Sequence, residues 1–161
     1  MKKKNKRIIG FTPAPNFKKK GNLVRGFTCG AFDLTHAGHY LMFEEARGQC
    51  DYLIVGLQLD PSVDRKEKNK PIQSIKERMI QLNACRYIDK IVTYKTEKSL
   101  YQLLKKINPN VRFMGKDWEN KPNYSRDHLP NMKVVYNSRN HNYSTSNLRK
   151  KIINSVKYGK N

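Results

Sequence analysis

The chain has 161 residues, of which 37% are hydrophobic and 10% aromatic, and this composition is sufficient for a single domain with a buried core. Lys and Arg outnumber Asp and Glu by 33 to 13, so the net charge is +20 and an anionic partner is expected. The longest apolar run, YLIVGLQL, is far shorter than the ~20 residues of a membrane span, and the basic N-terminus lacks the apolar stretch of a signal peptide, so we expect a cytoplasmic protein.

Residues 1–21 are expected to form a basic, poorly ordered arm, because they combine a lysine run and two prolines with no hydrophobic periodicity. The folded domain is expected to occupy residues 22–161. There, short apolar runs typical of strands alternate with segments whose apolar residues recur at helical spacing. Strands are predicted at 23–30, 52–57, 90–94, 111–115 and 133–136, and helices at 37–48, 74–85, 96–107 and 146–156.

Local signals support these boundaries. Ser74 and Glu77 have the spacing of a capping box, and Asn108-Pro109 should end the third helix, because the residue before a proline disfavours helical geometry. Residues 60–73 are predicted to be a polar loop. The alternation of strands and helices predicts an α/β fold, a Rossmann-like parallel sheet with helices on both faces. Ligands of such sheets bind beyond the carboxyl ends of the strands.

The stretch FTCGAFDLTHAGHY follows the first strand and leads into the first helix. His36 and His39 lie three residues apart, so they share one helix face, on the first turn, where free backbone N–H groups favour an anion. Gly38 and Gly30 would let a bulky group approach the backbone. These features favour a phosphate chain over the helix N-terminus, with both imidazoles donating hydrogen bonds to it.

Taken alone, the histidine pair leaves other interpretations open. It could lie on a solvated helix face without a role, or it could be half of a zinc site. A zinc site lacks an obvious third ligand, because His128, His141 and the cysteines are scattered along the sequence. The cysteines, Cys29, Cys50 and Cys85, have no metal-ligand spacing and are expected to be reduced thiols.

Several motifs in order along the chain resemble the cytidylyltransferase family. They are GAFD at Gly30–Asp33, HAGH at His36–His39 and RNHNYSTS at Arg139–Ser146, with KEKNKP, KERM, ACRYIDKIV and MGKDWE between them. The resemblance covers Leu23 to Ile153. The length and MGKDWE look most like glycerol-3-phosphate cytidylyltransferases, whereas KNKPIQSIKER and ACRYIDKIV also resemble the ethanolamine-phosphate enzymes. His-x-Gly-His alone is shared with adenylyltransferases and class I aminoacyl-tRNA synthetases.

The chain departs from the glycerol-phosphate pattern in places. Its late signature usually reads Arg-Thr-x-Gly-Ile-Ser-Thr-Thr, whereas here Asn142 stands at the glycine, and the arginine and hydroxyl run are kept. Asn can still adopt a left-handed conformation. Lys116 stands where these enzymes often have an acid. These departures affect the prediction of the acceptor more than the prediction of the reaction type.

The resemblance implies transfer of CMP from CTP to a phosphoalcohol, above all glycerol 3-phosphate, with release of pyrophosphate. Mg²⁺ is expected to bind with the triphosphate, without an all-protein metal site. An acceptor phosphate is already ionised near pH 7, so no general base or covalent nucleophile is required. The protein would position two anions and stabilise charge at the transferring phosphate. Family members are commonly homodimers.

The resemblance also implies roles for individual residues. Catalytic roles fall to His36, His39, Lys66 and Arg139. Nucleotide contacts are implied for Cys29, Gly30, Ala31, Phe32, Gly38, Lys68, Asp117, Tyr143, Ser144 and Thr145, and acceptor contacts for Asp33, Asp60 and Arg86. Structural alternatives stay open for several of them: a solvated charge run for the lysines, an ion pair for Arg86 and Asp117, helix capping for Ser144 and Thr145, and an Asx turn for Asp33.

Two other functions remain compatible with the sequence. The same fold could use ATP, as an adenylyltransferase. Alternatively, the chain could be a basic nucleic-acid-binding protein with a vestigial active site. Nine of the Lys and Arg residues lie within residues 1–25, which contain no acid, so nucleic-acid binding is expected to be non-specific at most.

Overall fold

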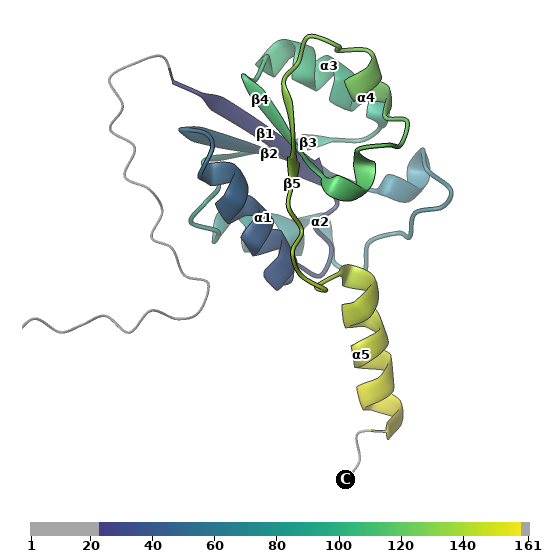
Figure 1. The fold of residues 1–161 in the computed structure, drawn as a ribbon. Coiled ribbons are helices and arrows are strands. Elements are labelled where there is room, and N and C mark those ends of the chain that lie inside the picture. The colour runs from purple at the N-terminus through teal and green to yellow at the C-terminus, as the bar shows by residue number, and fades with distance from the viewer. Residues whose placement is uncertain (1–22, 159–161) are drawn as a thin grey trace, which may run out of the picture.

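Five parallel strands form the centre of the structure (Figure 1), a computed structural model that describes residues 23–158. The strand order is β3-β2-β1-β4-β5, so the chain first winds outward from β1 and then crosses back to the other side of it. The basic arm predicted for residues 1–21 lies outside the described residues. The strands are β1 Arg25–Gly30, β2 Tyr52–Gln58, β3 Lys90–Tyr94, β4 Val111–Gly115 and β5 Val134–Asn137.

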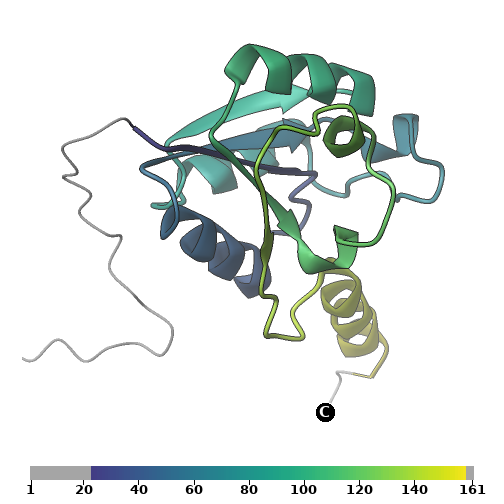
Figure 2. The same ribbon diagram turned by 45° about the horizontal axis from the view of Figure 1, so that its top comes forward.

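Helices cover both faces of this sheet, as predicted (Figure 2). The helices are α1 Ala37–Arg47, α2 Ile75–Asn83, α3 Glu97–Ile107, α4 Tyr124–Asp127 and α5 Thr145–Tyr158. One core cluster packs Phe43 of α1 and Leu82 of α2 against one face, and a second packs Leu100 and Leu104 of α3 against the other. Crossover connections between parallel strands are right-handed. Because the direction in which strands are added to the sheet reverses after β3, the helix that follows β3 lies on the opposite face.

The reversal places a switch point between β1 and β4. These two strands pair only where Gly26 and Phe27 meet Val111 and Arg112. By contrast, β1 pairs with β2 along all six of its residues. The carboxyl halves of β1 and β4 therefore separate, and open α/β sheets bind their ligands in such a crevice.

The predicted order of strands and helices is confirmed, with shifts of one or two residues at several ends. The Ser74–Glu77 capping box is present, and α3 ends at Asn108, whose φ of 46° is left-handed. Three short elements were not predicted: α4 and the 3₁₀ turns Pro61–Val63 and Lys116–Trp118. They are too short to show a hydrophobic period. No helix of residues 23–158 is both long and apolar enough to cross a membrane.

Arg78 holds the loops at the carboxyl ends of β1 and β2. Its side chain is only 2% exposed, and it donates four hydrogen bonds to backbone carbonyls. The acceptors are the carbonyl oxygens of Ala31, Gln58, Leu59 and Gln73, at 2.6 to 3.2 Å. A planar fork with five donors is suited to joining separate loops in this way. Arg78 thereby fixes the edge of the sheet on which the candidate site lies.

Candidate active site

The two histidines cap the N-terminus of α1 reciprocally. His36 is the N-cap residue, and its Nδ1 accepts a hydrogen bond from the Gly38 N–H at 3.1 Å. Nδ1 of His39 accepts from the His36 N–H at 3.3 Å. An Nδ1 atom that accepts leaves the proton of a neutral imidazole on Nε2. The ring centroids are 4.0 Å apart, so two Nε2–H donors lie side by side at the helix start.

The surroundings keep both imidazoles neutral. The pKa of His39 is lowered to about 3, mainly by burial and then by the neighbouring His36 and His141. Burial also lowers the pKa of His36, with smaller contributions from His141 and Arg139. At neutral pH the pair therefore offers hydrogen-bond donors without carrying full charges. This is a suitable way to hold a phosphate chain whose charge shifts during a reaction.

Phe32 supports the pair from the core and does not line the pocket. It is 4% exposed, and its ring lies edge-on to His39 at 5.5 Å between centroids and next to Phe43 at 5.2 Å. Phe32 and Leu34 both have a φ of 50°, in the left-handed region that non-glycine residues rarely occupy. Such strain is often concentrated at functional sites. The predicted nucleotide contact of Phe32 can therefore involve only its backbone.

A third histidine completes the cluster. A Cβ atom on Gly38 would lie 2.7 Å from Cε1 of His141 and 3.0 Å from Cε1 of His36, so glycine is needed for the imidazoles to approach α1. Nδ1 of His141 accepts from the Tyr143 N–H at 3.3 Å, which assigns an Nε2–H donor to this ring as well. His141 was not among the predicted site residues, although it lies within the RNHNYSTS motif. Sequence distance concealed it, since 102 positions separate it from His39.

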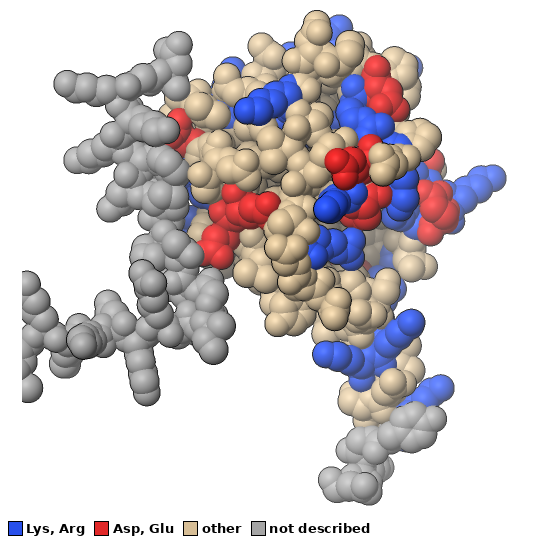
Figure 3. Space-filling view, in the orientation of Figure 1, with Lys and Arg blue, Asp and Glu red and all other residues tan. Residues whose placement is uncertain are grey.

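These rings line a pocket of about 580 Å³ between α1, the ends of β4 and β5, and the segment that leads into α5. The basic side chains of α5 stand out beside it (Figure 3), and this helix contains no acidic residue. A positive end of a helix next to basic side chains favours a polyanion. Among the predicted site residues, the pocket wall contains His36, Gly38, His39, Asp117, Arg139, Tyr143, Ser144 and Thr145.

Arg139 and Asp117 form an ion pair in the wall of this pocket. Nη1 of Arg139 lies 3.2 Å from Oδ1 of Asp117, and the two side chains are 45% and 46% exposed. A half-exposed ion pair contributes little to stability, so the guanidinium can exchange its partner for a ligand at small cost. Arg139 has a φ of 47°, and this left-handed turn directs the segment toward α5.

Ser144 and Thr145 begin α5. Ser144 Oγ accepts from the Asn147 N–H at 3.1 Å, which is N-capping, and Thr145 Oγ1 donates to the Asp33 carbonyl at 3.4 Å. Both residues also line the pocket, so capping and phosphate binding are compatible here.

The three predicted acceptor residues lie elsewhere. Asp33 is 7% exposed; its Oδ1 accepts from the Gln73 N–H at 2.9 Å, and its Oδ2 pairs with Arg149 of α5 at 2.7 Å. Asp60 caps the Pro61–Val63 turn through Ser62. Arg86 precedes β3, at the amino edge of the sheet, opposite the site. The structure does not bring these residues to a common pocket, and it gives Asp33 and Asp60 positioning contacts.

A second cavity of about 250 Å³ lies between the separated ends of β1 and β4. Its wall contains the predicted residues Cys29, Gly30, Ala31 and Lys68. Lys68 Nζ lies 5.7 Å from the centre of the Trp118 ring, across the cavity mouth. Lys66 is exposed in the same loop and lines neither space. The cavity and the histidine pocket share Met42 and Gly115, so the two are adjacent.

A parallel sheet with its site at the switch point, a histidine-capped helix and a basic helix start define an α/β nucleotide-binding protein. The chain belongs to the family described as Cytidylyltransferase-like, which matches residues 27–157. A probable ethanolamine-phosphate cytidylyltransferase of Encephalitozoon cuniculi is 48% identical over 75 residues, which are 47% of this chain and 23% of that protein.

Other relatives extend the comparison along the chain. The bifunctional protein HldE of Wolinella succinogenes is 36% identical over 123 residues, which cover 76% of this chain and 26% of that protein. The chain thus spans about a quarter of the length of these curated relatives. The crystal structure of a lipopolysaccharide core biosynthesis protein from Thermoplasma volcanium matches with a TM-score of 0.63 at 20% identity, covering 76% of this chain and all of that one. At this identity the match supports the fold.

Proposed function

We propose that the protein is a cytidylyltransferase, which transfers CMP from CTP to a phosphoalcohol and releases pyrophosphate. The observation that carries this proposal is the pair of neutral imidazoles with Nε2–H donors at the N-terminus of α1, in a pocket with Arg139 and the start of α5. The imidazole pair, Arg139 and the start of α5 each provide hydrogen-bond donors for phosphate in this pocket. Membership of the Cytidylyltransferase-like family supports CTP as the nucleotide.

The two adjacent spaces suit an in-line displacement. The triphosphate would lie in the larger pocket, and the acceptor in the cavity between β1 and β4, so the α-phosphate would be near their common boundary at Met42 and Gly115. An acceptor phosphate oxygen attacks the α-phosphate, and the bond to the β-phosphate oxygen breaks. The electron pair leaves with pyrophosphate. The acceptor phosphate is largely ionised near pH 7, so no side chain has to remove a proton.

Each side chain then has a distinct role. His36 and His39 donate hydrogen bonds to the triphosphate as charge develops on it. Arg139 leaves Asp117 and binds the β- and γ-phosphates with its planar fork. Ser144 and the backbone N–H groups of α5 bind the outgoing end. We propose that Lys66 and Lys68 move toward the α-phosphate with their loop when the substrates are bound.

We propose that Mg²⁺ enters with the nucleotide. Within residues 23–158, no three His, Cys, Asp or Glu side chains are placed to hold a metal ion. A cation held by phosphate oxygens and water, which Mg²⁺ prefers, requires no such set of protein ligands. When bound, it supplies charge neutralisation to the triphosphate, while the chain itself contacts the phosphates.

The test is pyrophosphate release over a matrix of four nucleoside triphosphates and several phosphoalcohols, with glycerol 3-phosphate and ethanolamine phosphate among them. We expect release with CTP, and glycerol 3-phosphate is the acceptor implied by the resemblance. Release with ATP alone would favour an adenylyltransferase. A complete lack of release, together with salt-sensitive retardation of DNA or RNA in a gel, would favour a binding protein.

Two further properties remain proposals. We propose a homodimer, which the resemblance implies and which analytical ultracentrifugation tests directly. We also propose action in a reducing compartment, supported by the three cysteines, which are free in the structure.

A further inference from the structure

The cavity between the carboxyl ends of β1 and β4 contains an unusual set of buried polar groups. Three widely separated segments supply its charged side chains: the loop after β2, the first turn of α3, and β4. They are Arg65, Glu97 and Arg112, together with the exposed Lys68 from the same loop as Arg65, and the rings of Tyr94 and Trp118 line the same cavity. Protein interiors rarely contain such groups without a partner.

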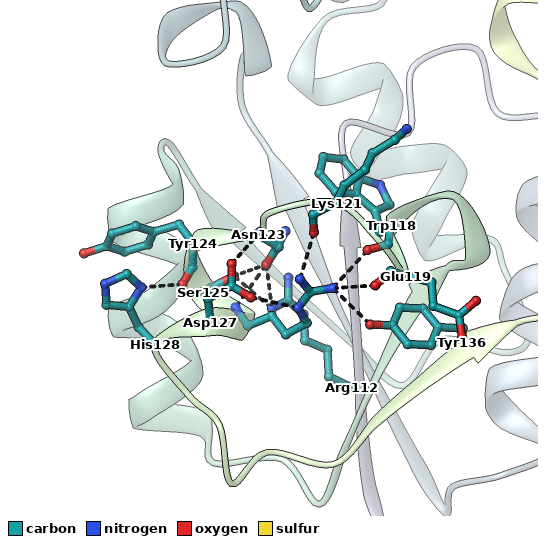
Figure 4. A network of polar contacts seen from close by, with 11 residues as sticks. Arg112, Trp118, Glu119, Lys121, Asn123, Tyr124, Ser125, Asp127, His128 and Tyr136 are labelled. Atoms are coloured by element: carbon teal, nitrogen blue, oxygen red, sulfur yellow. Dashed lines mark hydrogen bonds and ion pairs between the residues drawn. The ribbon is translucent and has the colours of Figure 1, made fainter.

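Arg112 is a buried cation without a carboxylate partner in the described part of the chain. It is 2% exposed, and its Nη1 donates to Ser125 Oγ at 2.8 Å and to Asn123 Oδ1 at 3.4 Å (Figure 4). Its Nη2 meets only the Cys29 sulfur, at 3.9 Å, and its Nε has no hydrogen-bond partner. Because Ser125 and Asn123 are neutral, most of the positive charge of the Arg112 guanidinium remains available to a ligand in the cavity.

Arg65 and Glu97 are also only partly satisfied. Nη1 of Arg65 lies 3.8 Å from Oε1 of Glu97, and its Nη2 donates to the buried Gln58 at 2.5 Å. Nε of Arg65, Oε2 of Glu97 and Nε2 of Gln58 have no partner among the described residues. Burial raises the pKa of Glu97, and Arg65 and Arg112 oppose this effect. Gln58 lies behind the cavity wall, so the side chains that line the cavity contribute two unpaired donor atoms, Arg65 Nε and Arg112 Nε, and one unpaired acceptor, Glu97 Oε2.

The chemistry of these groups defines what they can bind. A buried polar atom left unpaired is destabilising, so a ligand that supplies the missing partners binds more tightly through each such contact. The two donors require oxygen atoms, and the one carboxylate oxygen requires an O–H or N–H. Hydroxyl groups satisfy both, because each one accepts and donates. Arg65, Lys68 and Arg112 outweigh Glu97 in charge, so an ammonium group would be repelled.

We propose that this cavity binds the hydroxylated body of the acceptor, and that the acceptor is the phosphate of a neutral polyol or sugar and not of an amino alcohol. This inference rests on the proposed function, because the acceptor phosphate must reach the adjoining pocket at Met42 and Gly115. The volume of about 250 Å³ is below the range of ~300–1,000 Å³ typical of pockets for drug-sized ligands, which suits a small polyol.

Acceptor kinetics test the inference. With CTP saturating, kcat/KM is measured for glycerol 3-phosphate, a hexose 1-phosphate and ethanolamine phosphate. We expect a hydroxylated acceptor to exceed ethanolamine phosphate by at least about 10-fold, the equivalent of one hydrogen bond to a charged group. A preference for ethanolamine phosphate would overturn the inference and leave the cytidylyltransferase proposal intact.

A variant pair tests the residues. Glu97→Gln keeps the shape of the side chain but replaces the unpaired carboxylate oxygen, so the KM of the hydroxylated acceptor should rise roughly 10-fold while the KM of CTP stays constant. Glu119→Gln is the matched control: the same change on an exposed residue outside the cavity, for which neither constant should move. An unchanged acceptor KM in the folded Glu97 variant would refute the assignment.

Calorimetry tests the binding of the acceptor to the cavity separately from the proposed cytidylyl transfer. Glycerol 3-phosphate and ethanolamine phosphate are titrated into the full chain and into Glu97→Gln in the absence of nucleotide. Tighter binding of glycerol 3-phosphate, weakened in the variant, supports the cavity even where no turnover is observed. Equal binding of both compounds, or binding that the variant leaves unchanged, counts against it. Loss of pyrophosphate release with every acceptor would contradict the catalytic proposal instead.

Discussion

Single residues at the start of α1 determine the chemistry of the site. Three imidazoles from two distant segments point to one pocket, and each is held by a backbone N–H that bonds to its Nδ1. The backbone therefore selects the tautomer, and burial selects the neutral form. A site assembled in this way is organised before any ligand arrives, which is the condition for efficient electrostatic stabilisation.

His39→Ala should lower kcat roughly 100-fold or more, because one donor to the developing charge is lost. The side chain is largely buried against Phe32, so some loss of melting temperature is also expected, and the assay should be run well below it. Tyr40→Ala, the adjacent residue of α1, lies outside the pocket and serves as the control. Near-normal turnover of a folded His39→Ala protein would remove the catalytic role.

Protein stability should fall with pH below neutrality. The pKa of His39 is about 3 in the folded chain and about 6.5 when unfolded, so the unfolded state binds more protons between these values. The contribution is fully present above pH 6.5 and decreases by up to about 1.4 kcal/mol per pH unit as pH falls toward 3. Urea unfolding at pH 7 and pH 5 measures it. His39→Gln should reduce the difference between the two values, and an equal difference in both proteins would show that other groups cause it.

Arg139→Lys keeps the positive charge but loses the planar fork. If Arg139 binds the outgoing phosphates, the variant should lower kcat and raise the KM of CTP, each by several-fold or more. The KM of the acceptor should change much less, because the acceptor meets the α-phosphate from the opposite side. Steady-state kinetics with each substrate varied in turn decide the matter. A surface arginine paired only with Asp117 would leave both constants as they are.

At the scale of elements, two buried side chains connect segments that are distant in the sequence. Arg78 of α2 joins the ends of β1 and β2, and Asp33 joins the loop before α1 to the segment before α2 and to α5. Asp33 was predicted to contact the acceptor. Its two oxygens are instead engaged with Gln73 and Arg149, so it holds both the segment before α2 and the helix α5.

Arg78→Met should destabilise the fold by at least about 2 kcal/mol, since several backbone carbonyls would lose their donors in a buried region. Urea denaturation gives the change in the free energy of unfolding. Lys76→Met, an exposed position on the same helix, is the control and should stay within about 0.5 kcal/mol. Equal stability of the two variants would show that water replaces the guanidinium.

At the scale of the whole molecule, the sequence predicted the sheet, its layers and the histidine pair, because these depend on local periodicity and on a motif of adjacent residues. It did not predict His141 as a neighbour of the pair, or the cavity formed by Arg65, Glu97 and Arg112. Those groups meet only through the strand order, which no short window of sequence contains. Arg78 lies within the KERM motif, but nothing local indicates that it would be buried and hydrogen-bonded to four carbonyls.

The separation of β1 and β4 has a consequence for the order of events in catalysis. It creates two compartments that share Met42 and Gly115 in their walls, and each has its own polar lining. Neither substrate then has to pass through the space of the other, so either one can bind first. We expect sequential random kinetics with double-reciprocal lines that intersect. The CDP-alcohol, which would occupy both compartments, should inhibit competitively against CTP and against the acceptor. Parallel lines would instead indicate a covalent cytidylyl-enzyme, and the pocket would then have to contain a nucleophile.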